Sequence, residues 1–178
     1  MKKFLLFAVC LIGLSACNTK VGQSVTDSAT AYTVPDEKAI DKAVLDAYGA
    51  ICFKKGEQPR YNEIKNYFIP QAQLINFRAD SMQVTNLDQF IFLYRSVIEE
   101  GKIDLFYEKE LYGKTEQFGR IASRISTYKT YMNKLDTAEE RGVNSFQLVK
   151  TPAGWKVSSI IWDVEKPALK IPGYYLGK

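Results

Sequence analysis

Residues 145–165, which read SFQLVKTPAGWKVSSIIWDVE, constrain the fold more than any other part of the sequence. Two runs of alternating apolar and polar side chains flank residues 151–154, which include a proline and a glycine. Alternation with a period of two is typical of β-strands, and two such runs joined by a short glycine-containing connection predict a β-hairpin. The chain is therefore expected to contain a sheet that ends in this hairpin.

The remainder of the chain supplies helices first and strands later. Apolar residues at helical spacing predict a helix over residues 37–54, a short second helix that Pro70 ends, and a third helix over residues 86–101. A short strand at residues 73–78 precedes the third helix, which Asn86 is expected to cap. Long strand patterns follow at residues 103–115, 120–131, 142–150 and 155–165. This order predicts an α+β fold in which a strongly bent antiparallel sheet wraps over a long helix, with two further helices at the N-terminal side.

The first residues have the pattern of a secretory signal. Lys2 and Lys3 precede an apolar run at residues 4–14, and small residues follow it. The run is too short for a helix that spans a membrane, which needs roughly 20 apolar residues. Leu-Ser-Ala-Cys at residues 14–17 resembles the bacterial lipoprotein processing motif. That resemblance implies cleavage before Cys17 and acyl chains on it; the alternative is an ordinary cleaved signal.

These patterns divide the chain into four parts. Residues 18–34 are polar and rich in Ser and Thr, which is typical of a flexible tether. Asn18 follows the cysteine, where Asp is linked to retention in the inner membrane, so we expect a lipid anchor in the outer membrane, facing the periplasm. The expected parts are a signal peptide (1–16), the lipidated cysteine with its tether (17–35), a folded domain (36–166) and a C-terminal extension (167–178).

Composition and motifs exclude several classes of function. Lys and Arg number 24 and Asp and Glu number 20, and because the basic residues are dispersed we expect no nucleic-acid partner. The sequence contains no His, so Cys52 cannot belong to a Cys–His pair and is expected to be a buried residue of the first helix. No metal-ligand spacing, phosphate-binding loop or nucleophile elbow occurs, so we expect no metal and no cofactor.

Several short segments resemble one superfamily. They are residues 67–74 (YFIPQAQL), residues 120–122 (RIA) and the terminal hairpin with Gly-Trp-Lys-Val at residues 154–157. Together with the order of elements, they make residues 37–165 resemble the nuclear transport factor 2-like, or cystatin-like, superfamily. The resemblance implies a cone-shaped domain. It implies little about function, because the superfamily holds isomerases, dehydratases, hydrolases and non-catalytic binding or assembly domains.

The known chemistries of this superfamily fit the sequence poorly. Ketosteroid isomerases use a Tyr of the first helix, which Tyr48 could match, and an Asp base whose position falls at about Asn76. A neutral amide cannot accept the proton. Sites like that of scytalone dehydratase need His, and the Asp-Arg-Asp set of limonene epoxide hydrolase-like sites has no counterparts that we can place. Tyr48 is therefore expected to be core or pocket lining.

The two faces of the hairpin suggest different roles. If Lys150 lies opposite Trp155, one face is apolar in its middle and polar at one end, as a ligand pocket would be. The candidate pocket residues are Asn144, Phe146, Ser159 and Asp163, joined by Tyr48 and Tyr94 from the helices. The alternative is that this face packs on the third helix and holds no ligand.

The other face becomes apolar towards its end, at Ile160, Trp162 and Val164. Such a patch often marks an association surface, and the resemblance implies that relatives commonly pair through the outer face of the sheet. A homodimer is one explanation, and cover by the chain's own C-terminal extension is the other. A bulge near the turn would exchange the faces on one strand.

Three hypotheses about function follow. The first is a lipid-anchored envelope domain that binds a small apolar or amphipathic ligand, or a protein partner, without catalysis. The second is an isomerase, dehydratase or hydrolase-like enzyme that uses Asp163 and tyrosines. The third is an assembly module within an envelope complex. The absence of His and the amide at Asn76 favour binding.

Overall fold

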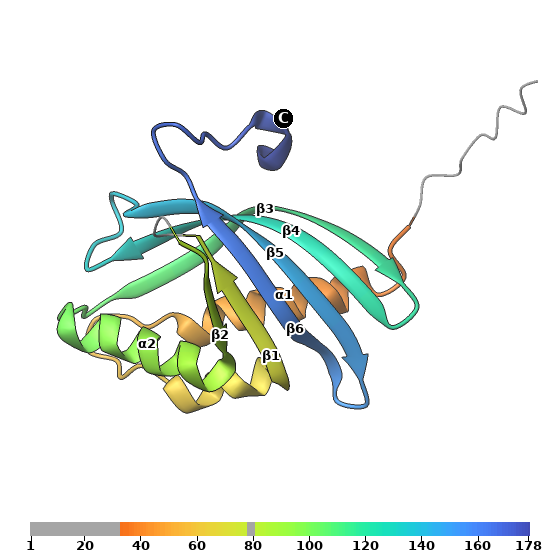
Figure 1. The fold of residues 1–178 in the computed structure, drawn as a ribbon, viewed down its shortest axis with the longest axis horizontal. Coiled ribbons are helices and arrows are strands. Elements are labelled where there is room, and N and C mark those ends of the chain that lie inside the picture. The colour runs from red at the N-terminus through yellow and green to blue at the C-terminus, as the bar shows by residue number, and fades with distance from the viewer. Residues whose placement is uncertain (1–32, 78–80) are drawn as a thin grey trace, which may run out of the picture. The chain divides into compact units, whose positions relative to one another are not determined.

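A six-stranded sheet curves around a helix in the computed structural model of the protein (Figure 1). The structure describes residues 33–77 and 81–178, and the unit that they belong to runs from Thr33 to Lys178. The predicted signal peptide, the predicted lipidation site at Cys17 and nearly all of the predicted tether lie outside the described residues. Within the described part of the chain, no helix is both long and apolar enough to cross a membrane.

The predicted α+β fold with a bent sheet is present, and the sheet is mixed, with one parallel pair among antiparallel ones. Its strands are ordered β2-β1-β6-β5-β4-β3, and β1 runs parallel to β6 while the other neighbours are antiparallel. The parallel pair joins β1, the first strand in sequence, to β6, the last. The strands are β1 (Phe68–Asn76), β2 (Gln83–Asn86), β3 (Phe106–Phe118), β4 (Ile121–Met132), β5 (Glu140–Thr151) and β6 (Gly154–Val164).

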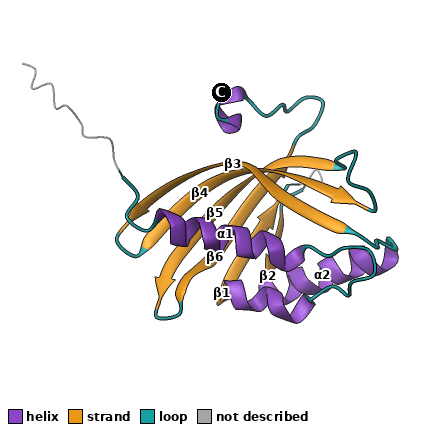
Figure 2. Ribbon diagram, turned by 180° about the vertical axis from the view of Figure 1, so that it is seen from behind, coloured by secondary structure: helices purple, strands orange, loops and turns teal. Residues whose placement is uncertain are grey.

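The helices α1 and α2 lie on one side of the sheet (Figure 2). The helix α1 (Glu37–Ile51) packs against β3 and β6, and α2 (Leu87–Glu100) packs against β1 and β2. The predicted second helix is a 3-10 helix, η1 (Tyr61–Tyr67). The helix α2 begins with the predicted capping box, in which the Asn86 side chain accepts a hydrogen bond from the Gln89 amide.

A β-bulge in β6 reverses part of the predicted face assignment. Leu148 pairs with Val157, but the next residue of β5, Gln147, pairs with Ser159, so Ser158 is an extra residue in β6. One extra residue moves every later side chain of the strand to the opposite face. The predicted facing therefore holds at Val157 and is wrong from Ser159 onwards. Beyond the bulge Ile160, Trp162 and Val164 face inwards with Phe146 and Asn144, whereas Ser159, Ile161 and Asp163 face outwards.

The C-terminal segment covers part of the outer face. It continues from β6 to a short 3-10 helix, η2 (Gly173–Leu176), which contacts β3 and β4. The Thr127 hydroxyl donates a hydrogen bond to the Tyr175 carbonyl, and the Lys114 ammonium donates one to the Tyr174 hydroxyl. Thr127 points outwards from β4 yet is fully buried, because this segment lies over it.

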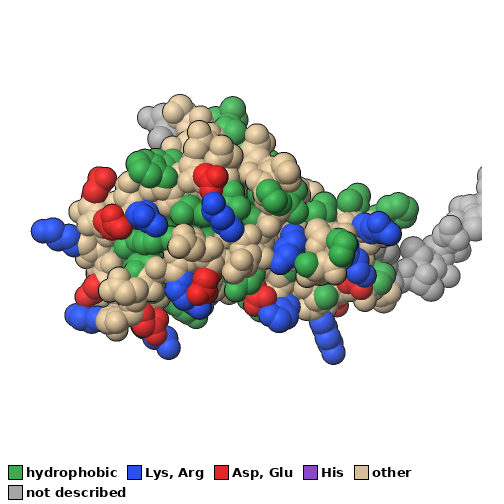
Figure 3. Space-filling view, turned by 90° about the horizontal axis from the view of Figure 1, so that it is seen from below, with side chains coloured by type: hydrophobic (Ala, Val, Ile, Leu, Met, Phe, Trp, Pro, Cys, Tyr) green, Lys and Arg blue, Asp and Glu red, His purple; other side chains and the backbone are tan. Residues whose placement is uncertain are grey.

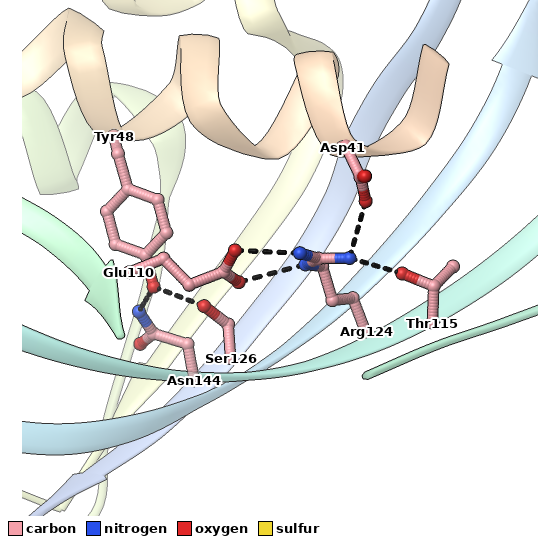
Figure 4. A network of polar contacts seen from close by, with 7 residues as sticks. All are labelled: Asp41, Tyr48, Glu110, Thr115, Arg124, Ser126 and Asn144. Carbon is pink, nitrogen blue, oxygen red and sulfur yellow. Dashed lines mark hydrogen bonds and ion pairs between the residues drawn. The ribbon is translucent and has the colours of Figure 1, made fainter. Parts of the chain in front are cut away.

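A buried ion-pair network fastens α1 to the sheet (Figure 4). Arg124 of β4 is 8% exposed and donates two hydrogen bonds to the Glu110 carboxylate, at 2.9 and 2.7 Å. Its remaining terminal nitrogen donates to Asp41 of α1 at 2.7 Å and to Thr115. The paired carboxylates raise the pKa of Arg124 against the opposing effect of burial. The network is thus internal to the protein.

We expect Arg124→Ala to lower the free energy of unfolding by about 3–5 kcal/mol, because the Glu110 carboxylate would stay buried without its cation. Asp41→Asn is the matched control, since the Asp41 side chain is 39% exposed and its loss should cost about 1 kcal/mol or less. Urea denaturation of the soluble chain that begins at Asn18 measures both values. Equal losses in the two variants would contradict a buried network centred on Arg124.

Candidate ligand cavity

A cavity of about 340 Å³ lies between the two α-helices and the inner face of the sheet. Its volume is at the lower end of the range typical of small-molecule sites, roughly 300–1,000 Å³. Most of its wall is apolar, with aromatic side chains from both helices and from β3, β5 and β6. The helices supply Tyr48, Phe90 and Tyr94, and the strands supply Phe106, Phe146 and Trp162.

These aromatic rings pack in specific orientations. Phe90 stacks on Tyr94 with ring centroids 6.2 Å apart and meets Trp162 edge to face at 6.4 Å. Tyr94 in turn meets Phe106 edge to face at 5.4 Å. Offset and edge-to-face contacts are favourable arrangements for aromatic pairs. The wall is therefore well ordered on the side of α2.

A neutral hydrogen-bond network occupies the wall beneath α1 (Figure 4). The Asn144 amide donates a hydrogen bond to the Tyr48 hydroxyl at 2.8 Å, and that hydroxyl shares a second bond of 2.7 Å with the Ser126 hydroxyl. All three side chains are buried. Burial, reinforced by the nearby Glu108 carboxylate, raises the pKa of Tyr48 well above its ordinary value. Tyr48 therefore stays neutral and acts as a hydrogen-bonding group of the wall.

Two carboxylates that the sequence analysis did not identify also line the cavity. Glu108 of β3 accepts a hydrogen bond from the Thr130 hydroxyl at 2.6 Å, and Glu140 of β5 accepts one from the Tyr128 hydroxyl at 2.9 Å. Glu140 follows another glutamate in the sequence, a pattern that suggests a solvated turn, but it is the first residue of β5. The alternation of side chains along β3 and β5 can indicate that Glu108 and Glu140 point into the cavity. It does so only once it is known which face of each strand is the inner one.

Four of the six predicted pocket residues line the cavity, namely Tyr48, Tyr94, Asn144 and Phe146. Their role in binding a ligand stays a prediction. Ser159 and Asp163 do not line it, because the bulge at Ser158 turns them to the outer face. Asp163 instead forms an ion pair with Lys166 at 3.3 Å. The second hypothesis thus loses the carboxylate on which it was built.

The predicted interface residues are also placed differently from the expectation. Ile160 and Trp162 line the cavity, and Val164 lies on the same inner face. These three side chains therefore do not form an outer association surface. A homodimer through the outer face stays a prediction, but it would have to use other residues, such as the 40%-exposed Ile161.

Comparisons with known proteins agree on the fold. No protein-family model matches the sequence, and a search of curated proteins found no significant match. Among solved structures, a cystatin-like protein of unknown function from Nostoc punctiforme aligns with a TM-score of 0.59 and 11% identity, covering 77% of this chain and 96% of its own. The chain has the nuclear transport factor 2-like fold.

Two further structures with the nuclear transport factor 2-like fold show how little that fold says about function. A protein of unknown function from Methylobacillus flagellatus aligns with a TM-score of 0.51 and 14% identity, covering 76% of this chain and 97% of its own. One from Parabacteroides distasonis, described as a putative ketosteroid isomerase, aligns with a TM-score of 0.52 and 11% identity, covering 80% and 96%. At these identities the likeness concerns the fold alone.

The position of the predicted isomerase base carries an amide that is already engaged. Asn76 lines the cavity and donates a hydrogen bond to the Gln83 side chain of β2 at 2.7 Å. The sequence analysis placed the base near this residue, and an amide has no basic group for proton abstraction. The nuclear transport factor 2-like fold is therefore present here without the carboxylate that this chemistry requires at Asn76.

We expect the Cys52 thiol to react slowly in the folded protein. Burial raises its pKa to about 11, although the Glu108 amide donates a hydrogen bond to the sulfur. At pH 8 the thiolate fraction is then on the order of 0.001, so alkylation should be about a hundredfold slower than in urea-unfolded chain. Cys52 is the sole cysteine of a chain that begins at Asn18, so mass spectrometry after iodoacetamide treatment reads it directly.

The rate in the folded protein should rise about tenfold per pH unit up to pH 10, because the thiolate is the reacting form. A rate at pH 8 that is equal in folded and unfolded chain would show that Cys52 is accessible and ionised, contrary to its position in the structure.

Proposed function

We propose that this protein is a lipid-anchored protein of the bacterial cell envelope that binds a small apolar or amphipathic ligand in its cavity, without catalysing a reaction. The observation that carries the proposal is the cavity of about 340 Å³, whose wall is mainly aromatic and aliphatic with a few polar groups. Such a composition is typical of small-molecule sites, where apolar surface supplies affinity and polar groups set orientation.

The neutral polar groups of the wall favour binding over catalysis, and the Glu108 and Glu140 carboxylates of the wall accept hydrogen bonds from Thr130 and Tyr128. Tyr48 is held neutral in a network with Ser126 and Asn144, and Asn76 is held by Gln83. Hydrogen-bonded neutral groups orient a ligand but do not exchange protons with it near neutral pH. The Parabacteroides distasonis structure is described as a putative ketosteroid isomerase, and the base of such an enzyme is predicted at about Asn76, which is an amide in this chain.

The N-terminal end of the described domain lies near the β3–β4 turn, and this position is compatible with an anchor upstream of the domain. The Asp36 amide donates a hydrogen bond to the Gln117 side chain, which lies near the β3–β4 turn. The cavity is lined by Phe106 and Met132, at the opposite ends of the same two strands. We propose that acyl chains on Cys17 hold the protein at the outer membrane, facing the periplasm, and that the cavity end of the domain stays accessible.

A pair of adjacent substitutions tests ligand binding. Ile160→Trp would fill part of the cavity, whereas Ile161→Trp adds the same side chain to the outer face next to it. With Nile red as an uncharged apolar probe, we expect Ile160→Trp to weaken binding by about tenfold or more, equivalent to about 1.4 kcal/mol. Ile161→Trp should bind the probe as the unchanged chain does.

Fluorescence titration of the soluble chain that begins at Asn18 measures both affinities, with circular dichroism as the check on folding. Equal binding by a folded Ile160→Trp variant would place the probe outside the cavity. Absence of binding by the unchanged chain would remove the proposed function.

Lipidation is tested in the full-length chain expressed in bacteria that are fed labelled palmitate. We expect the chain to incorporate the label and Cys17→Ser to lose it, because acyl chains on the cysteine need its thiol. Cys52→Ser is the matched control and should keep the label. Label on the Cys17→Ser variant, or none on the unchanged chain, would contradict the proposed anchor.

A further inference from the structure

Several apolar side chains of α2 and β2 beside the cavity are exposed at the surface of the domain. Leu93 and Val97 of α2 line the cavity and are also 37% and 46% exposed. Next to them Phe92 is 67% exposed, and Val84 on β2 is 45% exposed. Single exposed apolar residues are ordinary, but a contiguous patch beside a cavity commonly marks a binding surface. Figure 3 views the side of the domain that carries the helices and shows hydrophobic side chains at its surface.

This surface forms a shallow groove between α2 and β2, which we call the α2–β2 groove. Its lining residues are Gln83, Val84, Thr85, Asp88, Gln89, Phe92 and Leu93. Three of them, Gln83, Thr85 and Leu93, also line the cavity. The groove therefore adjoins the cavity along a shared wall, and an elongated molecule can contact both.

Taken together, the cavity and the α2–β2 groove have polar groups in one part and apolar residues in another. Tyr48 and Asn144 of the neutral network line the cavity and not the groove, and their partner Ser126 lies behind them. The apolar residues Phe92 and Val84 lie on the groove side. A ligand with one polar end and one aliphatic end would satisfy both regions if its polar end entered the cavity first.

We propose that the cavity and the α2–β2 groove together bind a long-chain amphiphile, with its polar end against the Tyr48–Asn144 network and its aliphatic chain along the groove over Phe92. The proposal rests on the proposed ligand-binding function and specifies the class of ligand. A ligand confined to the cavity would leave Phe92 and Val84 exposed to water, whereas an aliphatic chain in the groove removes that apolar surface from water.

Chain length is the variable that tests this arrangement. Hexanol and dodecanol are uncharged primary alcohols with the same polar end, and only the longer one can reach from the cavity into the groove. Each methylene that leaves water tightens binding by up to about fourfold, so dodecanol should bind much more tightly than hexanol. Isothermal titration calorimetry on the soluble chain that begins at Asn18 measures both affinities.

The Phe92→Ser variant tests the contribution of the groove to binding separately from that of the cavity. We expect this variant to weaken dodecanol binding by about tenfold and to leave hexanol binding unchanged, because Phe92 lines the groove and not the cavity. Phe118→Ser is the matched control, since Phe118 is 84% exposed at the β3–β4 turn and lines neither region. It should change neither affinity.

The outcomes distinguish this inference from the function on which it rests. If hexanol binds and dodecanol binds no more tightly, or if Phe92→Ser weakens neither, the cavity function stands and the groove proposal is overturned. If neither alcohol binds, both proposals fail. If gel filtration shows that Phe92→Ser dissociates a dimer of the unchanged chain, the patch is an interface between copies and the proposal is likewise overturned.

Discussion

The bulge at Ser158 determines which side chains this protein encloses. In a strand the side chains alternate, so the face that each residue occupies depends on every residue between it and the turn. With the bulge, Ile160 and Trp162 complete an aromatic and aliphatic wall opposite Phe90. A regular hairpin would instead turn Ser159 and Asp163 inwards and add a further carboxylate to those that already line the cavity. The apolar character of the β6 side of the wall thus depends on one extra residue in the backbone of β6.

The second constraint is the attachment of α1, which two polar contacts hold against the sheet (Figure 4). One is charged, between Asp41 and Arg124, and the other is neutral, between Tyr48 and the pair Ser126 and Asn144. Arg124 does not line the cavity, whereas Tyr48 and Asn144 do. The ionic contact therefore attaches α1 to the sheet at a place outside the cavity. Of the two contacts between α1 and the sheet, the one that a ligand can reach is uncharged.

Local patterns predicted local structure well. The two α-helices and the long strands in their order, the cap at Asn86 and the inward facing of Asn144 and Phe146 all follow from spacing within a few residues, whereas the short strand β2 was not predicted. The parallel pairing of β1 with β6 and the contact of Arg124 with Asp41 do not, because they join residues more than 80 positions apart. The bulge is a local feature, but the residues Ser158-Ser159 give no sign of which of them is extra. For that reason the faces of β6 had to be seen in the structure.

The case for binding depends on the cavity wall and not on the fold, since structures that share the fold do so at 11–14% identity. Asn76 shows how the wall limits the chemistry. Its amide nitrogen donates to the Gln83 side-chain oxygen on the neighbouring strand, which keeps this position neutral and hydrogen-bonded. An aspartate there could still be accommodated, because the Gln83 amide can turn over and donate through its nitrogen. The amide pair therefore gives this part of the wall neutral hydrogen-bonding groups, which orient a ligand without exchanging protons with it, while the Glu108 and Glu140 carboxylates elsewhere in the wall accept hydrogen bonds from Thr130 and Tyr128.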